Sequence, residues 1–386
     1  MPNAAKTQEA ARLHEATHQA VPWRLWGPYL SERQWGTVRE DYSASGAAWD
    51  SFTHDHARSR AYRWGEDGLA GYSDNLQRLC VGLALWNGRD PILKERLFGL
   101  TNGEGNHGED VKELYYYLDA TPTHSYLKML YKYPQAEFPY RRLVGENQRR
   151  GVGEGEYELL DTGVFDEDRY FDVVVEYAKA GPTDTLMRVT AVNRGPEAAT
   201  LHLLPQAWFR NTWSWGRESA RPTMVADGAA RVQARHETLG DLHLHFDGSP
   251  KLLFTDNDTN SAKLFGVPDS PRYAKDGFHD RVVGGRRDAV NDAGVGTKVA
   301  GWYQELVPPG GSVTIRVRFS APRQASPFAD FDRIVAQRIA EADEFYAEVQ
   351  KDIADPDARL VQRQAHPPST HHDRLGVFAG WLRLLA

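Results

Sequence analysis

Carboxylates, glycines and aromatic residues are concentrated between Glu95 and Tyr117, in the run ERLFGLTNGEGNHGEDVKELYYY. A second run of the same character extends from Trp35 to Gly68 and combines carboxylates, arginines and tryptophans with loop glycines. Aromatic faces stack on the C–H faces of sugars, and paired polar groups bind sugar hydroxyls through bidentate hydrogen bonds. Both runs therefore indicate carbohydrate handling.

A third run of this kind, RNTWSWG, follows the strand-like sequence LHLLPQAWF. Its two tryptophans and its arginine leave the end of a predicted strand, where they would cap a cleft or contact another domain. A role in the core alone is an equally open reading of these residues. Our candidates for sugar contact or domain contact are Trp35, Arg39, Glu40, Asp55, His56, Arg58, Trp64, Asn106, His107, Glu109, Asp110, Arg210, Trp213 and Trp215.

Several carboxylates in these runs stand in pairs, such as Glu40-Asp41, Glu66-Asp67 and Glu109-Asp110. Glycoside hydrolysis requires two positioned carboxyl groups, so such pairs could supply an acid and a base. Arginines flank the same carboxylates, and ion pairs between them would brace loops instead. We interpret each single carboxylate as structural or positioning, and we assign no catalytic residue.

Two short motifs match patterns for other chemistry. HEATH, from His14 to His18, matches the His-Glu-x-x-His zinc pattern, but it lies in a polar terminal helix without a third ligand. Gly103-x-Gly105-x-x-Gly108 matches the dinucleotide fingerprint, but neighbouring carboxylates would repel a pyrophosphate and no βαβ unit surrounds it. We interpret both as chance matches and predict no metal and no cofactor.

The composition narrows the class of protein. The chain has 386 residues, a formal net charge of −7, and 41% hydrophobic and 26% charged residues, which are values of a soluble globular protein. It has no basic stripe for nucleic acid and no apolar stretch long enough for a membrane span. The first residues lack the apolar segment of a signal peptide, and the single cysteine, Cys80, excludes an internal disulfide. We therefore expect a cytoplasmic protein with a buried, inert thiol and no nucleic-acid or membrane partner.

The patterning predicts a mainly β fold. Residues 1–22 read as a helical extension, and many short alternating runs after Tyr157, separated by turns, are typical of an antiparallel β-sandwich. The sequence PPGG at 308–311 predicts a hairpin between two such runs. We assign residues 23–325 to one large antiparallel sandwich domain with long polar and aromatic loops.

Helical spacing returns after the sandwich. Residues 329–354 have apolar positions on one helix face, and we interpret them as a linker helix. Residues 357–365 begin a second helix of about two turns, which is too short to cover that apolar face. Residues 366–386 form an atypical tail, with a patch rich in proline and histidine before a short apolar end.

Long, unusual segments of this chain resemble glycoside hydrolase family 63, the group of mannosyl-oligosaccharide glucosidase, also called processing glucosidase I. The resemblance extends from about Trp23 to Ala365. It rests on WGPYLSERQWGTVREDYS, DHARSRAYRWGEDG, ERLFGLTNGEGNHGEDVKE, YYYLDATPTHSY, LLDTGVFDEDRYFDV and HLLPQAWFRNTWSWG.

This resemblance implies an N-terminal β-sandwich, a helical linker and a C-terminal (α/α) barrel. Family members hydrolyse α-glucosidic bonds with inversion, and both catalytic carboxyl groups, an Asp acid and a Glu base, belong to the barrel. Residues 357–365 resemble the first barrel helix, and the resemblance stops after Ala365. We therefore expect the catalytic barrel to be missing, the tail to be a frameshift or a real terminus, and no position here to carry a catalytic role.

Three hypotheses follow. In the first, the chain is the sandwich domain of an α-glucosidase that acts on glucose-containing oligosaccharides. It would be inactive without its partner, the catalytic barrel domain of a full-length form. In the second, it is a stand-alone carbohydrate-binding or docking module that stacks sugars on Trp35, Trp64, Trp213 and Trp215. In the third, HEATH supplies a zinc enzyme.

Overall fold

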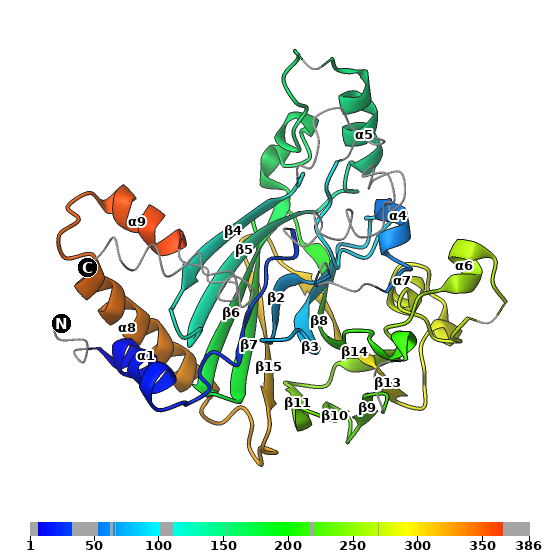
Figure 1. Cartoon of the computed structure of the whole chain (residues 1–386). Coiled ribbons are helices and arrows are strands. Elements are labelled where there is room, and N and C mark those ends of the chain that lie inside the picture. Colours follow the sequence, from blue (N-terminus) through cyan, green and yellow to red (C-terminus); the bar gives the residue numbers. More distant parts are fainter. Residues whose placement is uncertain are drawn as a thin grey trace.

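Two antiparallel sheets pack face to face around one apolar core, and helices lie at the margins of the sandwich (Figure 1). The predicted mainly β fold is therefore confirmed. All strand pairings between the described elements are antiparallel. The computed structural model describes residues 7–32, 53–61, 65, 67–100, 111–151, 153–216, 220–268 and 270–365.

The smaller sheet has six strands within the described ranges, in the order β1-β2-β3-β8-β14-β12. The central strands β3 and β8 are long and rich in leucine and alanine, and both of their faces are buried along most of their length. The strands are β1 (Trp26–Pro28), β2 (Leu69–Asp74), β3 (Leu79–Trp86), β8 (Ala199–Phe209), β14 (Lys298–Val307) and β12 (Lys251–Thr255).

The larger sheet has nine strands in the described part of the chain, in the order β13-β9-β10-β11-β15-β7-β6-β5-β4. A turn lies at PPGG, directly after Val307 of β14 and before Ser312 of β15. The predicted hairpin was wrong, because β14 pairs within the smaller sheet and β15 within the larger one, so the turn carries the chain from one sheet to the other. The strands are β13 (Val295–Gly296), β9 (Thr223–Ala226), β10 (Arg231–His236), β11 (Gly240–Phe246), β15 (Ser312–Ser320), β7 (Asp184–Asn193), β6 (Tyr170–Gly181), β5 (Tyr126–Pro134) and β4 (Leu114–Ala120).

Strand β8 shows how alternation divides the two faces of the smaller sheet. Leu201, Leu203 and Phe209 join the core between the sheets. Leu204 and Trp208, on the opposite face, join separate buried clusters outside it. Each buried leucine contributes about 1.5–3 kcal/mol to stability. Along β8 from His202 to Trp208, the outer face is therefore buried like the inner face.

Tyr29 closes the edge of the smaller sheet just after β1. Its ring lies against Gly71 so closely that a Cβ at that position would come within 2.4 Å of the ring. The Tyr29 hydroxyl donates to the carbonyl of Asp67 at 2.7 Å, and Cys80 and Trp208 complete the same buried cluster. The predicted buried thiol is thus confirmed.

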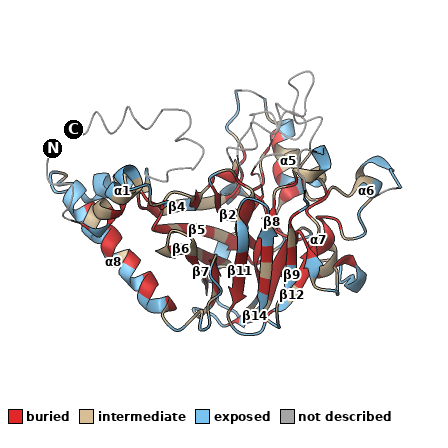
Figure 2. Ribbon diagram, turned by 60° about the horizontal axis from the view of Figure 1, so that its bottom comes forward, coloured by how far each residue is buried: buried red, intermediate tan, exposed pale blue. Residues whose placement is uncertain are grey.

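The long helix α8 (Phe331–Val349) covers the outer face of the larger sheet. Phe331, Ile334 and Val335 pack on residues of β6 and β7, and the hydroxyl of Tyr346 donates to the carbonyl of Ala120 at 2.6 Å. Figure 2 shows the buried face of α8 turned toward the strands and its other face exposed. The nine-stranded sheet covers most of the apolar face of α8, whereas Val349 at its end is 41% exposed.

The short helix α9 (Pro356–Gln364) buries none of its residues. Its Arg363 forms ion pairs with Asp119 of β4 and, at 2.8 Å, with Asp343 of α8. Leu360 and Val361 remain more than half exposed. Polar contacts therefore hold this helix in place.

The remaining described helices are short or lie at the N-terminus. Among the described residues, no helix has the length and apolar character needed to cross a membrane. These helices are α1 (Gln8–His18), α4 (His54–Ala57), α5 (Tyr140–Arg149), η1 (Leu160–Thr162), η2 (Asp166–Asp168), η3 (Trp213–Trp215), α6 (Ser261–Phe265), α7 (Gly277–Val282) and η4 (Arg287–Ala289).

Candidate functional site

The predicted site residues divide into those that the structure describes and those outside it. The described ones lie in two groups, at α4 and at η3. The candidates outside the described residues are Trp35, Arg39, Glu40, Trp64, Asn106, His107, Glu109 and Asp110.

The first group lies on α4, a single helical turn. The Thr53 hydroxyl caps it by accepting from the backbone N–H of His56 at 3.2 Å. Arg58 pairs with Asp55 at 2.5 Å between Nη2 and Oδ1, although the Asp55 side chain is 77% exposed. An exposed pair of this kind contributes about 0–1 kcal/mol. The pair therefore braces the turn, with Asp55 accessible at its surface and the Arg58 side chain only 14% exposed.

The second group follows β8, where the chain turns into η3. Trp213 packs on the edge of the main core, and Trp215 is 39% exposed. Arg210 donates its backbone N–H to the carbonyl of Arg78 at 3.0 Å, which fixes the exit from the strand. The exposed indole of Trp215 is thus carried on a firmly anchored turn.

Asp258 organises the second group from a distant part of the chain. Its Oδ1 accepts from the amide of Asn211 at 2.6 Å and from the indole N–H of Trp213 at 3.0 Å. Its Oδ2 pairs with Arg221 Nη2 at 2.5 Å, and the guanidinium lies 5.1 Å from the centre of the Trp213 ring. These charge-assisted contacts hold the indole in one orientation. We call these four residues, with Trp215 and Asp256, the tryptophan corner.

Asp256 adds a second carboxylate to the tryptophan corner. Its Oδ1 lies 3.0 Å from the same Arg221 nitrogen that pairs with Asp258. Burial raises the pKa of Asp256, while the charge of Arg221 acts in the opposite direction. The corner therefore combines an exposed ring with an arginine and two carboxylates, which are groups that contact sugar rings and hydroxyls.

The segment from Asp258 to Asn260 brings the two groups together. Asp258 holds the tryptophan corner, and the Thr259 hydroxyl accepts from the backbone N–H of Ala61 at 3.0 Å. The backbone N–H of Asn260 donates to the carbonyl of Ser59 at 2.8 Å. The α4 turn and the η3 turn are therefore fixed to three successive residues of one loop.

A buried charge cluster lies beneath α4. Asp67 pairs with Arg96 at 3.0 Å and with Lys275 at 2.6 Å, and Glu95 pairs with Lys298 at 2.8 Å. Lys275 also donates to the carbonyls of Ala57 and Arg60, the residues that end the α4 turn. All five side chains are at least nine-tenths buried. They form the support of the turn.

The pKa values in this cluster follow from burial and from charge. Burial alone would raise the pKa of Glu95, but Lys298, Arg96 and Lys275 hold it well below its usual range. Burial lowers the pKa of Lys275 to about 8, even though Asp67 favours its charged form. Because Glu95 is sealed and ionised at neutral pH, it does not act as an acid toward an external ligand.

The carboxylate near the end of the run from Glu95 to Tyr117 is also buried and paired. Glu113 accepts from Lys94 at 2.6 Å, from the backbone N–H of Phe98 at 3.0 Å and from the Tyr131 hydroxyl at 2.5 Å. These three donors satisfy both oxygens of a buried carboxylate. In the described part of the run, the carboxylates therefore brace the loop.

Metal chemistry finds no support in the described residues. No group of three or more His, Cys, Asp or Glu side chains there could hold an ion. In HEATH, the rings of His14 and His18 lie 4.6 Å apart, and Glu15 accepts from the indole N–H of Trp23 at 2.7 Å. The glutamate of the motif thus anchors the N-terminal helix.

Sequence reasoning missed Asn211, Arg221, Asp256 and Asp258. The signal that could have found them is the run DNDTN at 256–260, five consecutive polar residues directly after a strand. Such a run at a strand end commonly turns side chains back onto neighbouring loops. Its partners lie far away in the sequence, so the pairing itself was not visible.

Comparison with known proteins gives one extended relative. No family model matches the chain. The uncharacterized protein YMR196W of Saccharomyces cerevisiae is 42% identical over 406 residues, which cover 93% of this chain and 37% of the yeast protein. The chain therefore spans little more than a third of the length of that relative.

Solved structures show remote likenesses. A polysaccharide lyase, BACCELL_00875, has a TM-score of 0.30 at 13% identity, covering 68% of this chain and 28% of its own. A protein from the human microbiome assigned as a kojibiose phosphorylase has a TM-score of 0.29 at 7% identity, covering 76% of this chain and 33% of its own. Both of these proteins are named for activities on carbohydrates.

Proposed function

We propose that this chain is the sandwich domain of a family 63-like α-glucosidase and supplies one wall of its sugar-binding site. The observation that carries the proposal is the tryptophan corner. There, Trp215 is 39% exposed on the same turn as Trp213, which Asp258 and Arg221 hold in place. An exposed ring next to oriented polar groups is the usual construction of a sugar-contacting surface.

The catalytic carboxyl groups belong, in this proposal, to a barrel domain of a longer protein. The resemblance to family 63 assigns both groups to that barrel. Within the described residues, the buried carboxylates Asp67, Glu95 and Glu113 are all paired with cations. The much greater length of the yeast relative leaves room for a further domain. The chain alone is then expected to bind oligosaccharide without hydrolysing it.

The exposed helix α9 suits the place where such a barrel would dock. It shows Leu360 and Val361 to solvent, and its own attachment to the sandwich is polar. Apolar side chains on a docked helix commonly mark an interface. The family resemblance implies that this helix is the first helix of the barrel, whose further helices would cover its exposed side chains.

A hydrolysis assay tests the enzymatic half of the proposal. The purified chain and the full-length yeast relative are compared on glucose-containing α-linked oligosaccharides, with release of glucose as the readout. We expect turnover by the longer protein alone. Hydrolysis by the chain that persists through stringent purification would show that it carries its own catalytic groups.

A binding assay tests the carbohydrate half. Saturable change in tryptophan fluorescence with glucose oligomers is expected for the chain and is lost in Trp215→Ala. Tyr116→Ala, which removes another exposed ring (44% exposed) from β4, is the matched control and keeps the response. An identical response in both variants, or none in the unaltered chain at millimolar sugar, argues against a sugar site at the tryptophan corner.

The second candidate function is a stand-alone carbohydrate-binding module. The partial exposure of Trp215 favours it, because the ring is accessible without any further domain. The two functions differ in the longer protein. A stand-alone module binds sugar equally well when it is cut from that protein. A domain that forms only one side of a shared site binds sugar more weakly once it is cut from that protein.

A further inference from the structure

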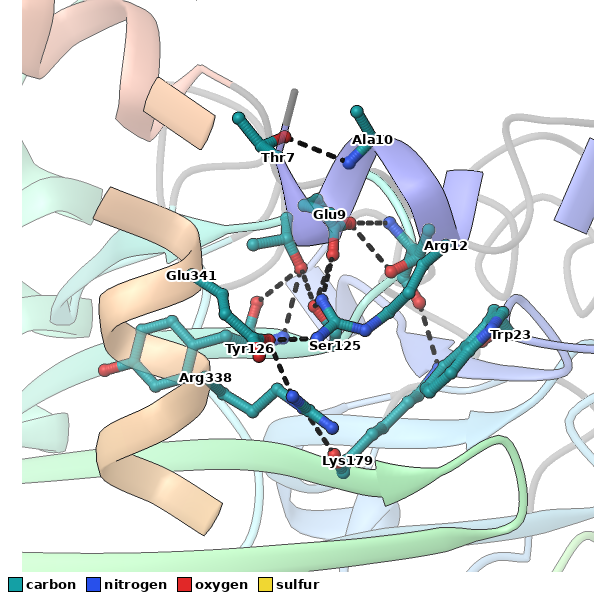
Figure 3. A network of polar contacts seen from close by, with 12 residues as sticks. Thr7, Glu9, Ala10, Arg12, Trp23, Ser125, Tyr126, Lys179, Arg338 and Glu341 are labelled. Atoms are coloured by element: carbon teal, nitrogen blue, oxygen red, sulfur yellow. Dashed lines mark hydrogen bonds and ion pairs between the residues drawn. The ribbon is translucent and has the colours of Figure 1, made fainter. Parts of the chain in front are cut away.

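A buried ionic network holds the N-terminal segment against the sandwich (Figure 3). Glu9 of α1 is fully buried, and its Oε1 accepts from the backbone N–H and hydroxyl of Thr123, both at 2.7 Å. Its Oε2 accepts from the Ser125 hydroxyl at 2.6 Å and from Arg12 at 3.0 Å. We call residues 7–28, which contain α1 and β1, the N-terminal latch.

The latch also reaches α8. Arg12 pairs with Glu341, which in turn pairs with Arg338 at 2.6 Å between Oε2 and Nη1. The Nε–H of Arg338 donates to the backbone carbonyl of Lys179 on β6 at 2.7 Å. Helix α1, helix α8 and the larger sheet are thus joined through a single chain of charged groups, as Figure 3 shows.

Lys179 holds the second half of the latch. Its buried ammonium group donates to the carbonyl of Trp23, to that of Trp26 at 2.7 Å and to that of Thr123 at 3.1 Å. Two of these three acceptors belong to the latch. Among the described residues, the ammonium group is bonded to these carbonyls and forms no ion pair with a carboxylate.

His124 and Lys179 both contact the carbonyl oxygen of Trp26. The Nδ1 of His124 lies 3.3 Å from this oxygen, and the His124 ring is 1% exposed. Within the described part of the chain, its Nε2 has no hydrogen-bond partner. Because Nδ1 donates to a carbonyl, the neutral ring is the form that fits this place. A proton on Nε2 would create a buried N–H without an acceptor.

The charged groups around His124 and Lys179 leave no carboxylate for a further cation. Glu9 is committed to Arg12, Thr123 and Ser125, and Glu341 is committed to two arginines. The groups that face the pair are Glu9 and Arg12 from α1, Arg24 from the latch, and Arg338 and Glu341 from α8. Cations therefore outnumber carboxylates here before His124 gains a proton.

We propose that the N-terminal latch is acid-sensitive: protonation of His124 places a second buried cation beside Lys179 and releases residues 7–28 from the sheet and from α8. The latch is closed when the ring is neutral. It opens when the ring is charged, since the free segment lets the imidazolium reach water.

The direction of the pH effect follows from proton linkage. Burial, with the charge of Lys179, holds the pKa of His124 well below its ordinary value. In the released state the pKa of a histidine is about 6.5, so the released state binds more protons in acid. Docking is therefore at full strength above that pH and weakens as the pH falls toward the pKa of the docked state.

Titration of Lys179 falls mainly outside the pH range in which His124 changes the docking. Burial lowers the pKa of Lys179 to about 7, so the amine is mostly protonated below pH 6.5 in both states. Docking of this lysine responds to pH mainly above neutrality. The change between pH 6.5 and pH 5 thus reports on His124.

Hydrogen exchange on the full chain tests the proposal. We expect amide exchange in residues 8–28 to accelerate about tenfold between pH 6.5 and pH 5, after correction for the intrinsic chemistry, from the ordinary histidine pKa. Peptides from β6 and β7 serve as the internal reference and should not change. Equal protection of the latch at both pH values would overturn the proposal.

A substitution isolates the residue responsible. His124 has a left-handed backbone conformation with φ of 57°, which asparagine tolerates, and the amide of His124→Asn can donate to the Trp26 carbonyl without titrating. This variant should keep the latch protected at pH 5. His279→Asn, at a half-buried histidine whose pKa burial lowers to about 4, is the matched control and should behave like the unaltered chain.

Folding is checked by the near-ultraviolet circular dichroism of each variant at pH 8. If His124→Asn does not fold, His124→Gly, which also suits a positive φ, takes its place. Acid release in the non-titrating variant equal to that of the unaltered chain would show that another group drives the transition.

Discussion

The buried charge cluster under α4 and the tryptophan corner beside it contain the same kinds of charged residue in opposite surroundings. Arg96 in the cluster has a side chain that is 1% exposed, whereas that of Arg221 in the corner is 45% exposed. Both arginines pair with two carboxylates. The segment between β12 and α7 contributes to both places, through Asp258 on one side and Lys275 on the other.

The two places differ in whether their ion pairs can exchange a partner for water or for a ligand. A sealed ion pair has already lost its water, so removing one partner leaves an uncompensated charge in a medium of low polarity. A partly exposed pair can trade its partner for water or for a ligand hydroxyl at small cost. The cluster therefore stabilises the position of the α4 turn, and the corner is the part of the surface that can bind.

The largest effect is expected from breaking the sealed cluster. Glu95→Ala leaves Lys298 and Arg96 without a carboxylate that both contact, and should lower the free energy of unfolding by about 3–5 kcal/mol. Urea denaturation measures it. The double variant with Lys298→Met should recover part of the loss. A loss below about 1 kcal/mol in the single variant would mean that water reaches the cluster.

An intermediate effect is expected at Asp258. Asp258→Ala leaves the indole N–H of Trp213 without its acceptor and removes one of the two acceptors of the Asn211 amide, and should cost about 1–3 kcal/mol. Near-ultraviolet circular dichroism should also change, because Trp213 loses its fixed orientation. Asp258→Asn keeps the side-chain shape and one acceptor oxygen, so its free energy of unfolding should lie between that of the unaltered chain and that of Asp258→Ala. An unchanged aromatic spectrum in the alanine variant would show that Asp258 does not fix the orientation of Trp213.

The smallest effect on stability is expected at Arg221. Arg221→Met removes an exposed cation but keeps an aliphatic contact with the Trp213 ring, so unfolding should change by less than about 1 kcal/mol. Arg169→Met, at an exposed arginine that also pairs with two carboxylates, is the matched control for stability. Only the change at Arg221 should weaken sugar binding. Equal affinity in both variants would place the sugar contact elsewhere.

The fold could be predicted to a large extent because its signals are local. Alternation of apolar and polar residues marked the strands. PPGG marked a turn between Val307 and Ser312, but the two strands that it joins belong to different sheets and form no hairpin. The linker helix was visible from its periodic apolar face. The surface that covers this face was not visible, because the contact of Phe331 with Leu186 joins distant parts of the chain.

The candidate site was only partly predictable for the same reason. Trp213 and Trp215 stood out by composition, but Asp258 acquires its role through contacts with residues more than a strand away. Composition also cannot distinguish a sealed carboxylate from an open one. Glu95 and Asp55 both come from runs of similar character, yet one is sealed and the other is mostly exposed.

The pairing of β3 with β8 has a consequence for how the chain folds. The two strands lie side by side from Leu79 opposite Phe209 to Trp86 opposite His202, and the whole of β4 to β7 comes between them in the sequence. During synthesis, the edge of β3 therefore waits unpaired until the hairpins of the larger sheet have emerged. Since long-range strand pairing is slow, this waiting edge is where misassembly and aggregation should begin.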